Sequence, residues 1–386
     1  MTLSIDDLKE QLYKRFYVPE RPDGHHSEWL TVDQVDQEIS SSNESYSKKK
    51  SISTDLGQLA RDGVLIQRKP SGKETLYQIK QEQSNLIEIR INSFEDFKHY
   101  LGLFRDTNNN KRLYFRGEPG EYDHRLPSIY RGGLNNLAKQ SDRFYSDLAV
   151  RMGDLNFLRE PRPTQLARFQ HYQAPTRLLD ISTNPLMALF FAVESSDQSD
   201  CQLFFYAIDA NKVKYQTGHT AMMKASVNWI KQTTVNNFML HVSKNTGKSN
   251  EDLLEENDVH LFMSRLNQLS NQIQLFDQPK EIYADLVNAQ FIDFIRDTPR
   301  MQEQQGAFIM PAYYTGIDDN SKVGSFIDNS ITEAVATEKG TSYKVFKISA
   351  KAKEDLRKYI SILGINAGTA YPDIEHFSRY LRDFYK

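Results

Sequence analysis

The stretch FQHYQAPTRLLDISTNPLMALFFA, Phe169–Ala192, places a cluster of polar side chains directly before a wholly apolar segment. Asn184 followed by Pro185 predicts a helix start, because asparagine caps helix N-termini and proline suits the first helical position. The helix that follows is apolar on every side, so we expect it to be buried. Hydroxyls, a histidine and an Arg/Asp pair before such a helix indicate an anion or sugar site. The polar residues of this cluster are His171, Tyr172, Thr176, Arg177, Asp180, Ser182 and Thr183.

The composition is that of a globular protein with room for two to three domains in 386 residues. Hydrophobic residues make up 39% of the chain, so disorder is not the default expectation. The net charge of −3 means that any nucleic-acid contact must come from a local basic patch. The single cysteine, Cys201, excludes internal disulfides and a cysteine-based zinc site. With no signal-peptide pattern and no apolar run of about 18 residues, the sequence predicts a soluble cytoplasmic protein without membrane contact.

Residues 1–85 are expected to form a separate small domain. Thr31 is a predicted helix cap, and the segment 51–63 has helical spacing with Gly63 as its stop. The segment VLIQRKPSGKETLYQIK, residues 64–80, predicts two short strands joined by a turn. Helices followed by a β-hairpin resemble a winged helix-turn-helix.

Basic residues near the expected recognition helix and on the expected wing suit contacts to nucleic-acid phosphates. Solvent-exposed lysines are common, however, and many winged helices bind proteins or dimerise, so a protein partner stays open. The residues concerned are Lys48, Lys49, Lys50, Arg68, Lys69 and Lys73.

Residues 86–386 interleave expected strands and helices without repeats, which predicts a larger mixed α/β domain and an overall α+β class. Residues 210–300 carry helical patterns but no recognisable motif, so a helical insertion is expected there. Strand patterns cover 86–91, 113–116, 201–208, 307–310 and 343–348.

Five motifs of this larger domain together resemble the FRG domain family, in the family's order. They are FRG at 115–117, LPSIYR at 126–131, the 169–192 block, RMQEQQGAF at 300–308 and GINAGTAYPDIEHFSRYL at 364–381. The family name by itself specifies no reaction.

An aromatic-Arg-Gly at the end of an early strand also resembles the first motif of many ADP-ribosyltransferases. This resemblance implies NAD as cofactor, an ADP-ribosyltransferase-like fold, and Arg116 as the residue that holds phosphates or the nicotinamide ribose. A hydroxyl segment would follow, at Thr176 or at Ser182 and Thr183. The late element would fall at Glu303, Gln304 or Gln305, with Gln305 the first choice and Glu303 the second. The late motif reads EQQG rather than Glu-x-Glu, which leaves the acceptor open.

The chemistry of glycosidic cleavage fits these residue types. A positioned carboxylate or amide stabilises the positive charge that develops on the sugar. A guanidinium offers two parallel donors to a pyrophosphate, and aromatic rings stack on nicotinamide. The expected catalytic residues are Arg116, Thr176, Gln305 and Glu303. The expected cofactor-binding residues are Tyr114, Phe115, Arg116, Gly117, His171, Tyr172, Thr176, Arg177, Asp180 and Ser182.

Each residue also has a purely structural interpretation. Arg116 could pair with Glu118, Arg177 could pair with Asp180, and His171 could be a core histidine or a cap. The favoured function is a toxin or defence effector that transfers ADP-ribose from NAD to a macromolecule, or an NAD glycohydrolase. The alternative is a non-enzymatic DNA-binding regulator whose FRG domain senses a nucleotide-like ligand. Nuclease chemistry is weaker, because no carboxylate cluster is spaced for a metal.

Overall fold

The computed structural model divides the chain into two units, residues 1–89 with 337–340 and residues 90–336 with 341–386. The structure describes residues 30–35, 56, 59–60, 65–68, 75–79, 89–195, 198–316, 322–337, 340–341 and 343–385. Among these residues, no helix combines the length and the apolar character needed to cross a membrane.

In the first unit, β1 (Leu65–Arg68) and β2 (Leu76–Ile79) pair antiparallel, as the sequence predicts for the hairpin. Leu30 joins Tyr77 of β2 through two backbone hydrogen bonds of 2.8 and 2.9 Å. Thr31 is the predicted cap, since its Oγ1 accepts from the Gln34 N–H at 3.1 Å. The expected recognition helix lies mostly outside the described residues, and so do Lys48, Lys49, Lys50, Lys69 and Lys73. Arg68 is described by its backbone in β1 alone, so the winged helix and its basic contacts stay predictions.

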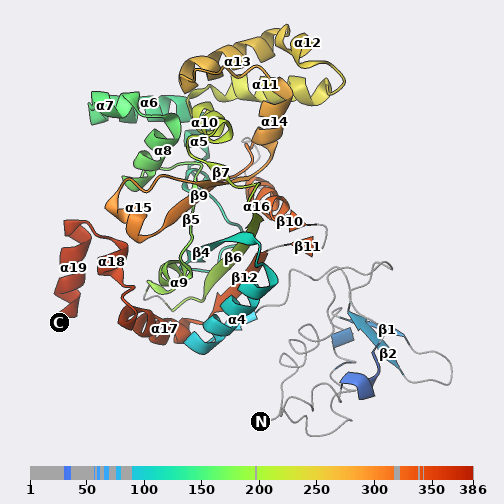
Figure 1. Ribbon diagram of the computed structural model, residues 1–386, viewed down its shortest axis with the longest axis vertical. Coiled ribbons are helices and arrows are strands. Elements are labelled where there is room, and N and C mark those ends of the chain that lie inside the picture. Colours follow the sequence, from blue (N-terminus) through green and yellow to red (C-terminus); the bar gives the residue numbers. More distant parts are fainter. Residues whose placement is uncertain are drawn as a thin grey trace. The chain divides into compact units, whose positions relative to one another are not determined.

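The second unit is built on an eight-stranded mixed sheet, which confirms the mixed α/β class (Figure 1). The strand order is β3-β12-β6-β4-β5-β9-β8-β7, in which β7 and β8 are parallel and the central pairs are antiparallel. The strands are β3 (Ile89–Ile91), β4 (Lys111–Glu118), β5 (Leu179–Ser182), β6 (Cys201–Asp209), β7 (Lys214–Tyr215), β8 (Gln290–Asp293), β9 (Gly306–Met310) and β12 (Tyr343–Ile348). Two short strands, β10 (Ala336–Thr337) and β11 (Gly340–Thr341), form a sheet of their own.

The apolar helix predicted from the central stretch is α9 (Pro185–Val193), and it is buried as expected. The Asn184 Oδ1 accepts from the backbone N–H groups of Leu186 and Met187 at 3.0 and 3.4 Å. This helix packs directly on β4, because a Cβ built at Gly117 would lie 1.9 Å from the Ala188 carbonyl oxygen. Gly117 is therefore required by the contact between strand and helix.

Other helices precede and follow β4 and α9 along the chain. They are α4 (Phe94–Thr107), α5 (Asn135–Lys139), α6 (Ser141–Met152), α7 (Leu155–Arg159), α8 (Arg162–His171), α15 (Pro299–Glu303), α16 (Val323–Ala334), α17 (Ala350–Ile362), α18 (Ala367–Ala370) and α19 (Ile374–Phe384), with 3₁₀ turns at Ser128–Tyr130 and Val227–Trp229.

A separate group of helices occupies the region where the sequence shows no motif, gathered at the top of Figure 1. These helices share a hydrophobic core of their own that includes Phe238, Phe262 and Leu286. They are α10 (His219–Ser226), α11 (Gln232–Lys244), α12 (Asn250–Leu254), α13 (Asn257–Ser270) and α14 (Pro279–Val287).

Candidate functional site

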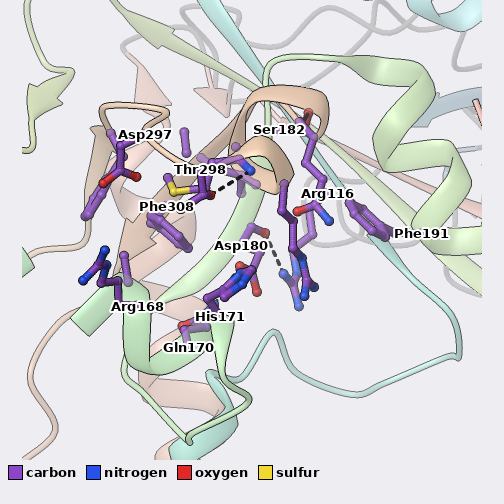
Figure 2. Close-up of a pocket in the computed structure, with 18 of the residues that line it drawn as sticks. Arg116, Arg168, Gln170, His171, Asp180, Ser182, Phe191, Asp297, Thr298 and Phe308 are labelled. Carbon is purple, nitrogen blue, oxygen red and sulfur yellow. Dashed lines mark hydrogen bonds between the residues drawn. The ribbon is translucent and has the colours of Figure 1, made fainter. Parts of the chain in front are cut away.

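A cavity of about 280 Å³ lies where the central sheet is least tightly paired. Strand β4 pairs with β6 along its whole length, from Lys111 to Glu118, but with β5 only at Phe115 and Ser182. Both strands line the cavity, together with residues of α8, α9, α15, β9 and the turn before α19. Figure 2 shows the side chains from these elements converging on one space. The cavity therefore brings together the FRG motif, the polar cluster and the late motif.

Arg116 lies in the cavity wall with its side chain 10% exposed. Its Nε donates to Glu118 Oε1 at 2.9 Å, its Nη2 lies 2.9 Å from the same oxygen, and its Nη1 donates to the Asp180 carbonyl at 2.6 Å. A guanidinium has five N–H donors, so two remain uncommitted among the described residues. The structure thus shows the expected Arg116–Glu118 pair and leaves Arg116 with donors for a ligand.

Glu118 is almost fully buried beneath this arginine, with its side chain 2% exposed. Its Oε2 has no hydrogen-bond partner within the described parts of the chain, and Arg131 Nη2 lies 3.9 Å from its Oε1. A buried carboxylate depends on nearby cations, because its charge has lost water. Arg116 therefore also has a structural role, which any test of its function must separate.

Thr176 does not line the cavity, although it supports a residue that does. It is fully buried, and its Oγ1 donates to Gln170 Oε1 and accepts from the Leu178 N–H at 3.1 Å. The Gln170 Nε2 in turn donates to Asp180 Oδ1 at 2.7 Å. Thr176 acts through Gln170 to fix the Asp180 carboxylate at the cavity wall.

Ser182 lines the cavity and connects β5 to the late motif. Its hydroxyl donates to the Gln304 carbonyl at 2.7 Å and accepts from the Asn184 N–H at 2.9 Å. Gln304 also lines the cavity. The hydroxyl cluster and the late motif are therefore in direct contact, 122 residues apart in sequence.

His171 lines the cavity from the end of α8. Burial lowers its pKa, the positive charges of Arg300 and Arg168 lower it further, and the Asp373 carboxylate opposes them. Arg168 itself is paired with Glu160 at 2.9 Å. Burial is thus the main reason that the pKa of His171 is lowered, and the nearby arginines add to it.

Several expected site residues lie elsewhere. Tyr114 lies on the same face of β4 as Arg116 but belongs to the hydrophobic core rather than to the cavity lining, and its hydroxyl donates to Asp293 Oδ1 at 2.8 Å. Tyr172 is 67% exposed at the C-cap of α8. Arg177 is buried and bonded to Tyr130 and other neighbours rather than to Asp180, so the local ion pair considered above does not form.

The late motif presents a different residue from the two chosen from sequence. Glu303 is exposed on α15, and Gln305 contacts Thr183 with its Oε1 at 3.4 Å from the hydroxyl. The Gln305 carbonyl accepts from the Thr183 N–H at 3.1 Å. Only Gln304 of these three glutamate and glutamine residues lines the cavity, because the turn before β9 directs its neighbours elsewhere.

Sequence analysis missed the far wall of the cavity, which comprises Glu194, Arg300 and Tyr371. The Tyr371 hydroxyl donates to Glu194 Oε2 at 2.7 Å, and the Arg300 Cζ lies 5.1 Å from the Tyr371 ring centroid. Burial raises the pKa of Glu194, against the lowering effects of the Tyr371 hydrogen bond and Arg300. Two signals were available: a charged residue directly after the apolar helix, and Tyr371 inside the C-terminal motif.

The FRG domain model matches residues 111–201. The chain carries an FRG domain. The match runs from β4 to the start of β6 and includes Arg116, His171, Asp180, Ser182 and Glu194, whereas Arg300 and Tyr371 lie beyond it. No curated protein matches the chain, and no solved structure matches it either. Within the described residues, no group of three or more His, Cys, Asp or Glu side chains is placed to hold a metal ion.

Proposed function

We propose that the FRG-domain cavity binds NAD and that the protein transfers ADP-ribose to a macromolecule, or to water as an NAD glycohydrolase. The observation that carries the proposal is Arg116: a nearly buried guanidinium in a cavity wall, with two uncommitted N–H donors. Guanidinium groups bind phosphate through parallel donors, more strongly in a desolvated site than in water.

The rest of the cavity suits the nicotinamide ribose end of the dinucleotide. Phe191 and Phe308 line it and offer ring faces for an aromatic base. Its volume of about 280 Å³ is at the small end for ligand pockets, so the adenosine half would lie outside it. Asp180 and Glu194 supply carboxylates at the wall, in place of the exposed Glu303.

The proposed reaction breaks the bond between the ribose C1′ and the nicotinamide nitrogen. Nicotinamide leaves with the electron pair, and an oxygen or nitrogen nucleophile of the acceptor, or water, bonds to C1′ and gives up its proton. A wall carboxylate would stabilise the positive charge that develops on the sugar, which lowers the barrier.

One observation favours a second function, in which the domain binds a nucleotide-like ligand without turnover. Both wall carboxylates already accept hydrogen bonds, Asp180 from Gln170 and Glu194 from Tyr371. Side chains held this firmly suit recognition. In that case the N-terminal unit, whose described part includes the predicted hairpin, would carry the output to nucleic acid or to a protein partner.

Free nicotinamide release from NAD by the full-length protein, with NAD binding measured by calorimetry, tests the proposal. Arg116→Lys keeps a cation beside Glu118 but loses the planar fork, so we expect a near wild-type melting temperature with turnover reduced at least tenfold. Arg151→Lys, on the exposed surface of α6, is the matched control. Binding without nicotinamide release would favour the sensing function, and no NAD binding at millimolar concentration would reject both uses of NAD.

A further inference from the structure

Arg300 is the most weakly engaged arginine of the cavity. It lies on α15, and its guanidinium makes no hydrogen bond or ion pair with any other residue that the structure describes. Arg116 and Arg168, the other two arginines of the lining, are tied to Glu118 and Glu160. All five N–H donors of Arg300 are therefore uncommitted, at half-buried positions where water is partly displaced.

The Tyr371 ring gives this guanidinium a fixed support. The Arg300 Cζ lies 5.1 Å from the ring centroid, a distance typical of an arginine stacked on an aromatic face. The ring is itself held in place, because its hydroxyl donates to Glu194 Oε2 at 2.7 Å and the Ala370 carbonyl before it accepts from Gln304 Nε2 at 3.0 Å. A guanidinium held by stacking keeps its donors free, and a rigid support lowers the entropy cost of binding a ligand.

Most of the charged groups near Arg300 already have protein partners, and the cavity lining also holds the carboxylates of Asp180 and Asp297. His171 and Arg168 come from α8, Asp373 from the cap of α19 and Glu194 from the end of α9. Arg168 forms an ion pair with Glu160. Asp373 Oδ1 lies 2.7 Å from His376 Nδ1, and Glu194 accepts a hydrogen bond from the Tyr371 hydroxyl. Burial is the largest cause of the lowered pKa of His171, and the charge of Arg300 adds to it, which places the Arg300 guanidinium near His171 in the cavity.

We propose that Arg300, stacked on Tyr371, is the anion anchor of the cavity and that it binds a phosphate group of the ligand. The substrate class is a phosphate ester with an aromatic base, in which Arg300 and Arg116 each contact phosphate oxygens. The identification of the base rests on the proposed function, whereas the anion subsite does not.

Inorganic pyrophosphate is the probe that tests the subsite directly, by calorimetry on the full-length protein at low salt. Arg300→Gln should weaken pyrophosphate binding about tenfold or more, because it removes the charge and both parallel donors. Arg300→Lys, which keeps a point charge, should lose less affinity for pyrophosphate. Arg151→Gln, on the exposed surface of α6, should leave that affinity unchanged. Melting temperatures of all variants separate lost binding from lost folding.

The outcomes distinguish this inference from the proposed function. Pyrophosphate binding that is lost in Arg300→Gln, in a protein that neither binds nor cleaves NAD, would uphold the subsite and reject NAD as ligand. Arg300→Gln should weaken the binding of nicotinamide mononucleotide, which has a phosphate. It should not weaken the binding of nicotinamide riboside, which has none. Wild-type affinity of Arg300→Gln for pyrophosphate, or no pyrophosphate binding by the wild type, would overturn the inference.

Discussion

Arg116 and Arg177 both lie in the segment that matches the FRG domain, and both are nearly buried, yet their surroundings differ completely. Arg116 has a carboxylate partner, borders a cavity and keeps two donors without a partner among the residues that the structure describes. Arg177 has no carboxylate within ion-pair distance in the described parts of the chain, and it bonds to Tyr130, Ser141, Asn228 and the Ala138 carbonyl. The comparison teaches that the use of a motif arginine depends on the segments that fold around it.

Arg177 joins four segments that are far apart in sequence. Its Nη1 donates to Asn228 Oδ1 at 2.7 Å and to Ser141 Oγ at 3.0 Å, and its Cζ lies 5.0 Å from the Tyr313 ring centroid. Burial by itself would lower its pKa, but Tyr130, Tyr313 and Tyr145 raise the pKa above the ordinary value. Arg177 therefore stays charged and holds the structure together beneath the site.

The largest expected effect comes from removing this cation. Arg177→Met strands four buried acceptors, each of which has lost water and gains nothing in return. We expect a loss of about 3 kcal/mol or more in the free energy of unfolding, measured in urea. Arg116→Lys, which keeps its ion pair, is the matched variant and should lose about 1 kcal/mol or less. Equal losses in the free energy of unfolding would mean that Arg116 and Arg177 contribute equally to the stability of the fold.

The sequence predicted local elements well wherever a cap or an alternating pattern defined them. Asn184 caps α9, the Thr31 hydroxyl accepts from the Gln34 N–H, and β12 spans the predicted 343–348. It also predicted a mixed α/β class. Short-range chemistry fixes these features, because capping and burial depend on neighbours within a few residues.

The arrangement around the cavity could not be predicted in the same way. Tyr114 and Arg116 share one face of β4, yet only Arg116 lines the cavity, and the sheet order that places β4 between β6 and β5 comes from pairing between distant segments. Arg300 and Tyr371 meet across 71 positions of sequence. The contact between these two residues has no local signature, so the sequence could not pair them even though each belongs to a recognisable motif.

The second prediction, with a smaller expected effect, concerns Lys224, a buried lysine in the region around Arg177. Lys224 donates to the Asp285 and Asn288 carbonyls at 2.8 Å, and its own carbonyl accepts from Asn228, a partner of Arg177. Burial lowers the pKa of Lys224 to about 7, and Asp285 opposes the shift. The unfolded chain therefore binds more protons than the folded one between pH 7 and the ordinary lysine value near 10.5, so stability must rise with pH in that window.

From pH 7 to pH 9 this linkage amounts to about 2 kcal/mol, with stability lowest at pH 7. Lys224→Met should abolish that part of the slope, and the difference between the two proteins in urea unfolding isolates it from other titrating groups. If stability changes with pH in the same way in both proteins, then Lys224 stays charged in the folded state, as Arg177 does.

The smallest expected effect concerns Gln305, the residue chosen from sequence for the late motif. It adopts a φ of 47°, a left-handed conformation that glycine accepts without strain. Its backbone carbonyl accepts from Thr183 and from Arg296, so the contacts that join it to the polar cluster survive loss of the side chain. Gln305→Gly should relieve strain in the folded state while adding freedom to the unfolded state, for a net change below about 1 kcal/mol. Ligand binding and nicotinamide release, measured on the same preparation, should stay near wild type.

Gln304→Ala is the paired variant, because Gln304 lines the cavity and its amide holds the turn before Tyr371. A tenfold fall in turnover for Gln305→Gly at an unchanged melting temperature would return Gln305 to the site and show that its side chain moves into the cavity when ligand binds.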